Sequence, residues 1–228
     1  MLHYFTLNTA VEIICFFIAI FCLIKDANLA WRSMILFLFI TCIVEMIGIY
    51  IKRLNLTDST HVHSNAWIYN VLIFFQAAFF SLMFQYLLNK YIKKYIFIAG
   101  FTLVIILHVY EIFHHGILIY DGLTNIVMSV LLVLYSFYFY YCLIKDNLYI
   151  NLKYSPEFWW VAGVLFFYFG TTSCNLFYDK LSSIVISTKQ NLMYLKYLYN
   201  TFNIILYGCW SYSFICRKWL TKTLQSLS

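Results

Sequence analysis

The sequence has 228 residues, of which 64% are hydrophobic, 22% are aromatic and 11% are charged, and its net charge is +6. Soluble domains carry about 25% charged residues, so this composition excludes an ordinary soluble domain and indicates a protein surrounded by lipid. One proline and seven glycines leave no change in composition that would mark a linker. We therefore expect residues 1–228 to form a single membrane domain.

Seven apolar runs divide the chain, and each is near the roughly 20 residues that a helix needs to cross about 30 Å of hydrocarbon. Backbone polar groups must be paired with one another in lipid, so we expect these runs to be helices. Their predicted bounds are about 8–24, 31–51, 66–88, 95–113, 122–144, 158–178 and 194–216. The predicted fold class is an all-α integral membrane protein with seven transmembrane helices.

The first three predicted helices each carry a polar side chain within an apolar run. Glu12 lies in the first turns of the first helix, Glu45 late in the second, and Asn70 early in the third. Because successive helices run in opposite directions, these residues are expected at the same, outer level. An ionisable side chain in the membrane costs roughly 2.5–3.5 kcal/mol on insertion scales, so it usually faces the bundle interior or a wet cavity.

The fourth predicted helix ends with the stretch HVYEIFHH. His108, Glu111 and His115 are spaced i, i+3 and i+7, so they share one helical face. This face would suit Zn²⁺ or Fe, with Glu45 as a fourth ligand, or would form a pH-responsive His–Glu pair. The alternative is that His114 and His115 are interfacial residues before a turn and that His108 bonds to a neighbouring helix.

The last three predicted helices also carry polar groups in their outer halves. Asn125 opens the fifth helix, Asn175 lies in the sixth, and Asn200 and Asn203 lie in the seventh. The pattern favours an outward-facing polar cavity above an inner half that is sealed by Leu, Phe and Tyr. Its candidate ligand-binding residues are Glu12, Glu45, Asn70, Glu111, Asn175, Asn200 and Asn203. Scattered amides that bond adjacent helices are the alternative.

Lys and Arg are distributed unevenly between the two predicted sides of the membrane. Ten lie on one side, namely Lys25, Arg32, Lys90, Lys93, Lys94, Lys145, Lys153, Arg217, Lys218 and Lys222. Five lie on the other side, namely Lys52, Arg53, Lys180, Lys189 and Lys196. The positive-inside rule therefore predicts an outer N-terminus and a cytoplasmic C-terminus. The net charge is then a signal of topology, so we expect no nucleic-acid partner.

Some features recur along the chain. CLIKD ends both the first and the fifth predicted helix, and an offset of 130 residues carries Asn70 onto Asn200 and Glu45 onto Asn175. These matches predict two parallel repeats of three helices around an unpaired fourth helix, a 3+1+3 plan. Chance matches in a sequence of biased composition are the alternative.

The stretch SPEFWWVAGVLFFYFG, with an Asn-bearing last helix that ends in basic residues, carries a family resemblance. The matching positions are Ser155, Pro156, Phe158, Trp159, Gly163, Leu165, Tyr168, Phe169 and Gly170. The chain resembles uncharacterised seven-transmembrane proteins of Bacteroidota that are often encoded beside sensor histidine kinases. The resemblance covers the last third well and the remainder in hydropathy. It implies the fold, a histidine-kinase partner and a multi-pass location in the bacterial inner membrane, and no catalytic residue.

Taken together, these patterns favour a membrane sensor. A small ligand, proton or ion would enter the outer cavity, and a separate partner would read the change, because the short loops and tail hold no signalling domain. An oligomeric pore or small-solute transporter is the alternative. A weaker alternative is an intramembrane hydrolase that uses Zn or Fe held by His108, Glu111 and His115. No Walker A, G-x-S-x-G or H-E-x-x-H motif is present, so we expect neither a catalytic residue nor another cofactor.

Overall fold

The structure is a computed structural model, and it describes residues 6–57, 64–146, 151–185 and 189–226, with the backbone alone at 55–57, 175–185, 189–196 and 220–226. The helices in these ranges are α1 (Leu7–Leu23), α2 (Leu29–Thr57), α3 (Ala66–Leu88), α4 (Lys94–His115), α5 (Gly122–Lys145), α6 (Pro156–Val185) and α7 (Lys189–Ser226). A 3-10 turn, η2 (Leu152–Tyr154), precedes α6. The predicted all-α fold is confirmed for this part of the chain.

The observed helix bounds agree with the predicted ones in α1, α3, α4 and α5 and extend beyond them elsewhere. α3 covers the predicted 66–88, and α1, α4 and α5 begin and end within two residues of the prediction. α2, α6 and α7 continue to Thr57, Val185 and Ser226. Apolar length alone sets the predicted ends, whereas backbone hydrogen bonding can continue a helix through polar residues beyond its apolar run.

Local sequence signals explain where two of the helices begin or end. α6 begins with Pro156 at its first position, where the fixed φ of proline suits a helix. Ser155 precedes it, and its hydroxyl accepts a hydrogen bond from the Phe158 N–H at 3.3 Å. α4 ends at Gly116, whose φ of 78° is a conformation that favours glycine. These signals place α4 and α6 independently of their packing.

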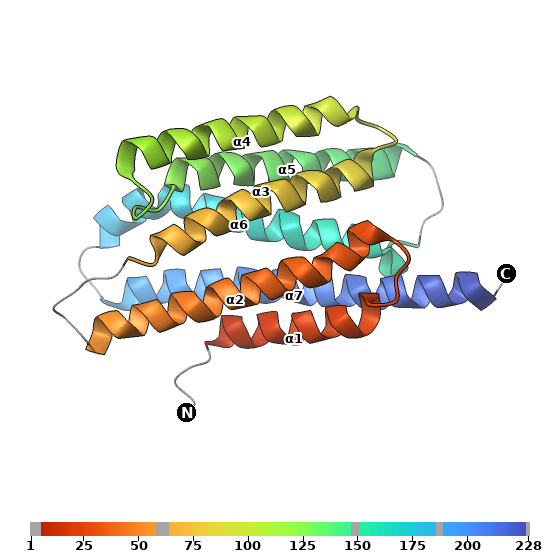
Figure 1. Cartoon of the computed structure of the whole chain (residues 1–228), viewed down its shortest axis with the longest axis horizontal. Helices are drawn as coiled ribbons and strands as arrows, with labels where there is room; N and C mark the ends of the chain where they lie inside the picture. The colour runs from red at the N-terminus through yellow and green to blue at the C-terminus, as the bar shows by residue number, and fades with distance from the viewer. Residues whose placement is uncertain (1–5, 58–63, 147–150, 186–188, 227–228) are drawn as a thin grey trace.

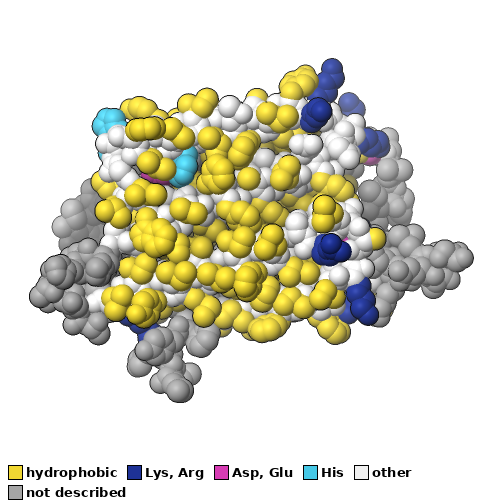
Figure 2. All heavy atoms as spheres, viewed as in Figure 1, with side chains coloured by type: hydrophobic (Ala, Val, Ile, Leu, Met, Phe, Trp, Pro, Cys, Tyr) yellow, Lys and Arg dark blue, Asp and Glu magenta, His cyan; other side chains and the backbone are white. Residues whose placement is uncertain are grey.

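Four of the described helical segments are long and apolar enough to cross a membrane, namely Leu29–Leu54, Ala66–Leu88, Lys94–His115 and Gly122–Lys145. α1 is a shorter apolar helix of 17 residues. Apolar side chains cover the middle of the bundle surface in Figure 2, and Phe21 and Phe113 are 75% and 87% exposed. Such an exposed apolar surface is consistent with a helical membrane protein, because lipid can cover it.

The contacts between helices form a closed ring, and α4, at the top of the bundle in Figure 1, lies outside it. α1 packs against α2 and α7, α3 packs against α2 and α5, and α6 packs against α5 and α7. These contacts close a ring of α1, α2, α3, α5, α6 and α7, and α4 packs on α3 and α5. The interior of the ring is therefore bounded by helices from both halves of the chain.

Lys and Arg side chains gather at one end of the bundle, on the right in Figure 2, which we call the basic end. The Arg217 guanidinium bonds to Asp26 there at 2.8 Å, and Lys90 bonds to Asp146 at 2.9 Å. Hydrogen bonds from the Tyr91 hydroxyl and from Lys90 lower the pKa of the Asp146 carboxyl. The α4–α5 loop lies at the opposite end (Figure 1).

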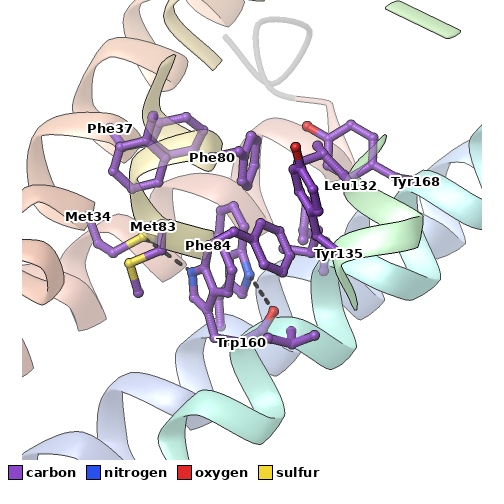
Figure 3. Packing of buried hydrophobic residues seen from close by; sticks show 14 of the residues in the cluster. Met34, Phe37, Phe80, Met83, Phe84, Leu132, Tyr135, Trp160 and Tyr168 are labelled. Atoms are coloured by element: carbon purple, nitrogen blue, oxygen red, sulfur yellow. Dashed lines mark hydrogen bonds between the residues drawn. The ribbon is translucent and has the colours of Figure 1, made fainter. Parts of the chain in front are cut away.

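Aromatic side chains from several helices pack together inside the ring (Figure 3). The Trp160 and Trp210 rings are stacked with centroids 6.0 Å apart, and the Phe84 ring meets Trp160 edge-on at 5.4 Å. The Trp160 indole N–H donates to Met34 Sδ at 3.3 Å, and the Trp210 N–H donates to the Trp160 carbonyl at 3.2 Å. All four side chains are at most 1% exposed. The two indole N–H groups are thus satisfied inside the core.

Candidate functional site

A cavity of about 340 Å³ lies inside the ring, toward the end opposite the basic end. It is bounded by α2, α3, α5, α6 and α7 and by the α4–α5 loop. Its lining includes the half-buried carboxylate of Glu45 and the amides of Gln76, Asn125 and Asn203. These polar groups come from four different helices, so the tertiary fold brings them to one site.

Tyrosines and hydroxyl groups make up much of the remaining lining. The tyrosines are Tyr69, Tyr120, Tyr168, Tyr199 and Tyr207. The hydroxyls of Thr41, Ser129 and Thr171 donate to the backbone carbonyls four residues earlier, at 2.9, 2.7 and 2.7 Å. Because their protons are used within the helices, these three oxygens can only accept a further hydrogen bond.

Glu12 lies beside this cavity and is 2% exposed. Its carboxyl group is close to Glu45, Cys42 and Tyr207, and its Oε1 has no hydrogen-bond partner among the described residues. Two of the carboxylates predicted to meet at the outer level therefore do lie near each other. Only Glu45 of the two lines the cavity.

The floor of the cavity adjoins the aromatic core. The Tyr168 ring meets Phe80 edge-on at 5.5 Å, and the Tyr207 ring meets Trp210 edge-on at 5.9 Å. Phe80 and Trp210 are each 1% exposed. The cavity thus ends on packed rings before it reaches the basic end.

Asn70 does not line the cavity and instead holds the α4–α5 loop. It is fully buried, and its amide N–H group donates to the carbonyls of Ile117 and Ile119 at 3.0 and 2.7 Å. Its carbonyl oxygen accepts from the Asp121 N–H at 3.1 Å. The side chain therefore satisfies three backbone groups of a turn, which is a structural role.

Glu111 and His108 have partners in the same region of the bundle. The Glu111 carboxylate accepts hydrogen bonds from the N–H groups of Leu123 and Thr124, at 3.0 and 2.7 Å, and so caps α5. The His108 Nδ1 lies 2.8 Å from the Asp121 carboxylate. Burial raises the pKa of this Asp121 carboxyl, and its contact with His108 opposes the rise.

The three residues of the predicted metal site on α4 have different surroundings. His115 is exposed, whereas His108 and Glu111 are buried. Among the described residues, no group of three His, Cys, Asp or Glu side chains is arranged to hold a metal ion. The Zn or Fe site at His108, Glu111 and His115 remains a prediction, and the structure gives two of these residues other partners.

The asparagines of the last two helices have different positions. Asn203 lines the cavity, and its amide donates to the Tyr199 carbonyl at 3.2 Å. The Asn200 carbonyl oxygen accepts from the Asn8 amide at 2.9 Å, which joins α7 to α1. The side chain of Asn175 lies outside the described residues, although its backbone belongs to α6.

Sequence reasoning did not select Gln76 or the tyrosines as site residues. Gln76 is a single amide in an apolar run, which is the same signal that identifies Asn70. The tyrosines carry no such signal, because 21 of them are spread along the chain and most resemble core or interfacial residues. Comparison with family models, curated proteins and solved structures found no match.

Proposed function

We propose that the protein is a receptor-like membrane protein that binds a small solute in this cavity from the outer side. The observation that carries the proposal is a polar cavity enclosed by five helices whose floor is a packed aromatic core. A receptor needs access from one side together with closure toward the other. A cavity with convergent polar groups inside an apolar bundle is also the usual form of a small-molecule site.

The distribution of charge supports this orientation. The basic end corresponds to the cytoplasmic side under the positive-inside rule, so the cavity lies toward the outside. On this topology all seven helices cross the membrane of the bacterial cell, and the chain begins outside. The orientation and the seven spans are part of the proposal.

Signalling on this proposal passes to a separate partner at the basic end. α7 carries Tyr199, Asn203 and Tyr207 in the cavity wall, and further along it Arg217 bonds to Asp26 at the basic end. A shift of α7 upon ligand binding would therefore alter that surface. The family resemblance suggests a sensor histidine kinase as the partner. Purification of the tagged chain from its own cells should recover such a kinase, and its absence would remove it from the proposal.

Accessibility of one serine tests the proposal directly. Ser129 lines the cavity, and Ser136 lies two turns further on the same face of α5, fully buried. Both hydroxyls donate to the carbonyl four residues earlier. Ser129→Cys should react with a membrane-impermeant thiol reagent added outside to spheroplasts, whereas Ser136→Cys should not. Labelling is measured as the increase over the parent chain, whose seven cysteines are free thiols.

Two results would contradict the proposal. Reaction of Ser129→Cys only in inverted vesicles would place the cavity on the cytoplasmic side. Equal reaction of Ser129→Cys and Ser136→Cys from outside would mean that the aromatic core does not close the bundle.

A transporter is the second candidate, and the ring of helices favours it. α1 packs on α2 as α5 packs on α6, and α2 packs on α3 as α6 packs on α7. The second helix pair in each comparison lies four helices later in the chain. Two parallel repeats around an axis along the membrane normal would produce this arrangement. The structure would then correspond to an outward-open state. Solute flux into proteoliposomes would support this candidate over a receptor.

A further inference from the structure

The described lining of the cavity holds an acidic side chain and no basic one. Glu45 contributes a carboxylate, and none of the described lining residues is Lys, Arg or His. The hydroxyls of Thr41, Ser129 and Thr171, which also belong to the lining, donate their protons to backbone carbonyls. A cation is the occupant whose charge and hydrogen-bond donors complement this lining.

A second carboxylate strengthens the same preference. Glu12 is buried close to Glu45, and its Oε1 is without a hydrogen-bond partner among the described residues. Cys42 and Tyr207 approach this carboxyl group and leave its Oε1 unsatisfied, so a positive charge placed beside it would favour the ionised form over the neutral acid. The pair of carboxylates therefore favours a positively charged occupant over a neutral one.

The aromatic lining identifies the type of cation. Five tyrosine rings line the cavity, and sets of aromatic rings attract ammonium groups through the negative faces of their π-systems. A metal ion would instead require several His, Cys, Asp or Glu ligands, and no such group of three occurs in the described part of the chain. A volume of about 340 Å³ is near the lower limit of ligand pockets, about 300–1,000 Å³.

We infer that the cavity binds a small organic cation, an amine or a quaternary ammonium compound. Its charge lies against the Glu45 carboxylate and its alkyl groups lie against the tyrosine rings. The inference rests on the proposed function, because the ligand must enter a cavity that is open on the outer side.

Protection of the cavity thiol provides the test. The Ser129→Cys chain in spheroplasts is treated with the thiol reagent in the presence of choline, its neutral isostere 3,3-dimethylbutan-1-ol, or the anion 3,3-dimethylbutanoate. These three probes share a branched head and differ in charge. Choline should slow the labelling most and the anion least. Equal or better protection by the neutral alcohol, or no protection by any probe, would overturn the inference.

Matched carboxamide variants assign the charge preference to one residue. Glu45→Gln, combined with Ser129→Cys, should weaken protection by choline about tenfold, as expected for loss of a charge-assisted contact. Glu157→Gln is the control, because Glu157 is a part-exposed glutamate at the start of α6, near the basic end. Retained protection in Glu45→Gln, or protection by Na⁺ equal to that by choline, would contradict an organic-cation site.

A second pair of variants tests the aromatic contribution. Tyr120 lies in the α4–α5 loop, is 48% exposed and lines the cavity, so its replacement should leave the helices intact. Tyr120→Phe should keep protection by choline, and Tyr120→Leu should reduce it. Equal loss in both variants would assign the effect to the hydroxyl and would argue against the ring.

The outcomes separate the two proposals. If Ser129→Cys reacts from outside but shows no preference for the cation, the outer cavity stands and the ligand class is wrong. If Ser129→Cys fails to react from outside, the proposed function itself fails.

Discussion

At the scale of single residues, tertiary contacts give His108 and Glu111 of the stretch HVYEIFHH partners in the loop and helix that follow. Asp121 stands at the N-cap position of α5, where its carboxylate would cap the helix by local rules. Its side chain makes no capping bond and lies instead against His108. Glu111 of α4 caps α5 in its place, through two backbone N–H groups. One helix thus supplies the cap of the next.

The capping of α5 by Glu111 predicts an effect on stability. Glu111→Ala should lower the free energy of unfolding by about 1–2 kcal/mol, because two N–H groups at the start of α5 lose their acceptor. His115→Ala is the control on the same helix and should have little effect, since His115 is exposed. Unfolding in detergent micelles measures both variants. Loss of a stoichiometric metal in His115→Ala would instead support the predicted metal site.

At the scale of helices, α6 and α7 approach closely where Gly163 lies. A Cβ atom built on Gly163 would lie 3.1 Å from the Cys209 Cβ and the Leu206 carbonyl oxygen. Small residues permit such an approach between membrane helices, where van der Waals contact replaces the hydrophobic effect as the main attraction. Gly208, on α7, has no atom within 4 Å of its built Cβ.

The two glycines predict opposite outcomes. Gly163→Val should destabilise the protein by about 1–3 kcal/mol, because the backbone of α7 has to move away. Gly208→Ala should be neutral or slightly stabilising, since alanine is the better helix former and space is available. Thermal unfolding in detergent compares them. If Gly163→Val left the stability unchanged, α6 and α7 would have to lie further apart at Gly163 than the structure shows.

At the scale of the whole molecule, ion pairs at the basic end join distant parts of the chain. Asp26 and Asp146 are the last residues of the two CLIKD motifs. Asp26 binds Arg217, with side chains 3% and 15% exposed, and so ties the α1–α2 loop to α7. Asp146 binds Lys90, whose side chain is 65% exposed. The same motif therefore makes one buried pair and one surface pair.

The attachment of the α1–α2 loop to α7 should depend on the buried Asp26–Arg217 ion pair. Asp26→Asn should lower the stability by about 3 kcal/mol, near the lower limit for breaking a buried pair, because the largely buried Arg217 guanidinium loses the negative charge of Asp26 beside it. Asp146→Asn is the matched control and should have little effect, since water screens an exposed pair. Unfolding midpoints in detergent at low salt measure the difference. Equal effects of the two substitutions would mean that Asp26–Arg217 is not a buried connection between α1 and α7.

Composition and the lengths of apolar runs are local properties, and they predicted an apolar, all-helical bundle and the places of its helices. They also predicted that Glu12 and Glu45 lie near each other, and in the structure the two carboxyl groups are close. Which polar groups share the cavity depends on tertiary packing. Asn70 and Glu111 were predicted for the cavity but bond to backbone groups, whereas Gln76 and five tyrosines line it. A side chain reaches the cavity only if its face of the helix is turned toward the neighbouring helices that enclose it. The sequence does not reveal which helices are neighbours.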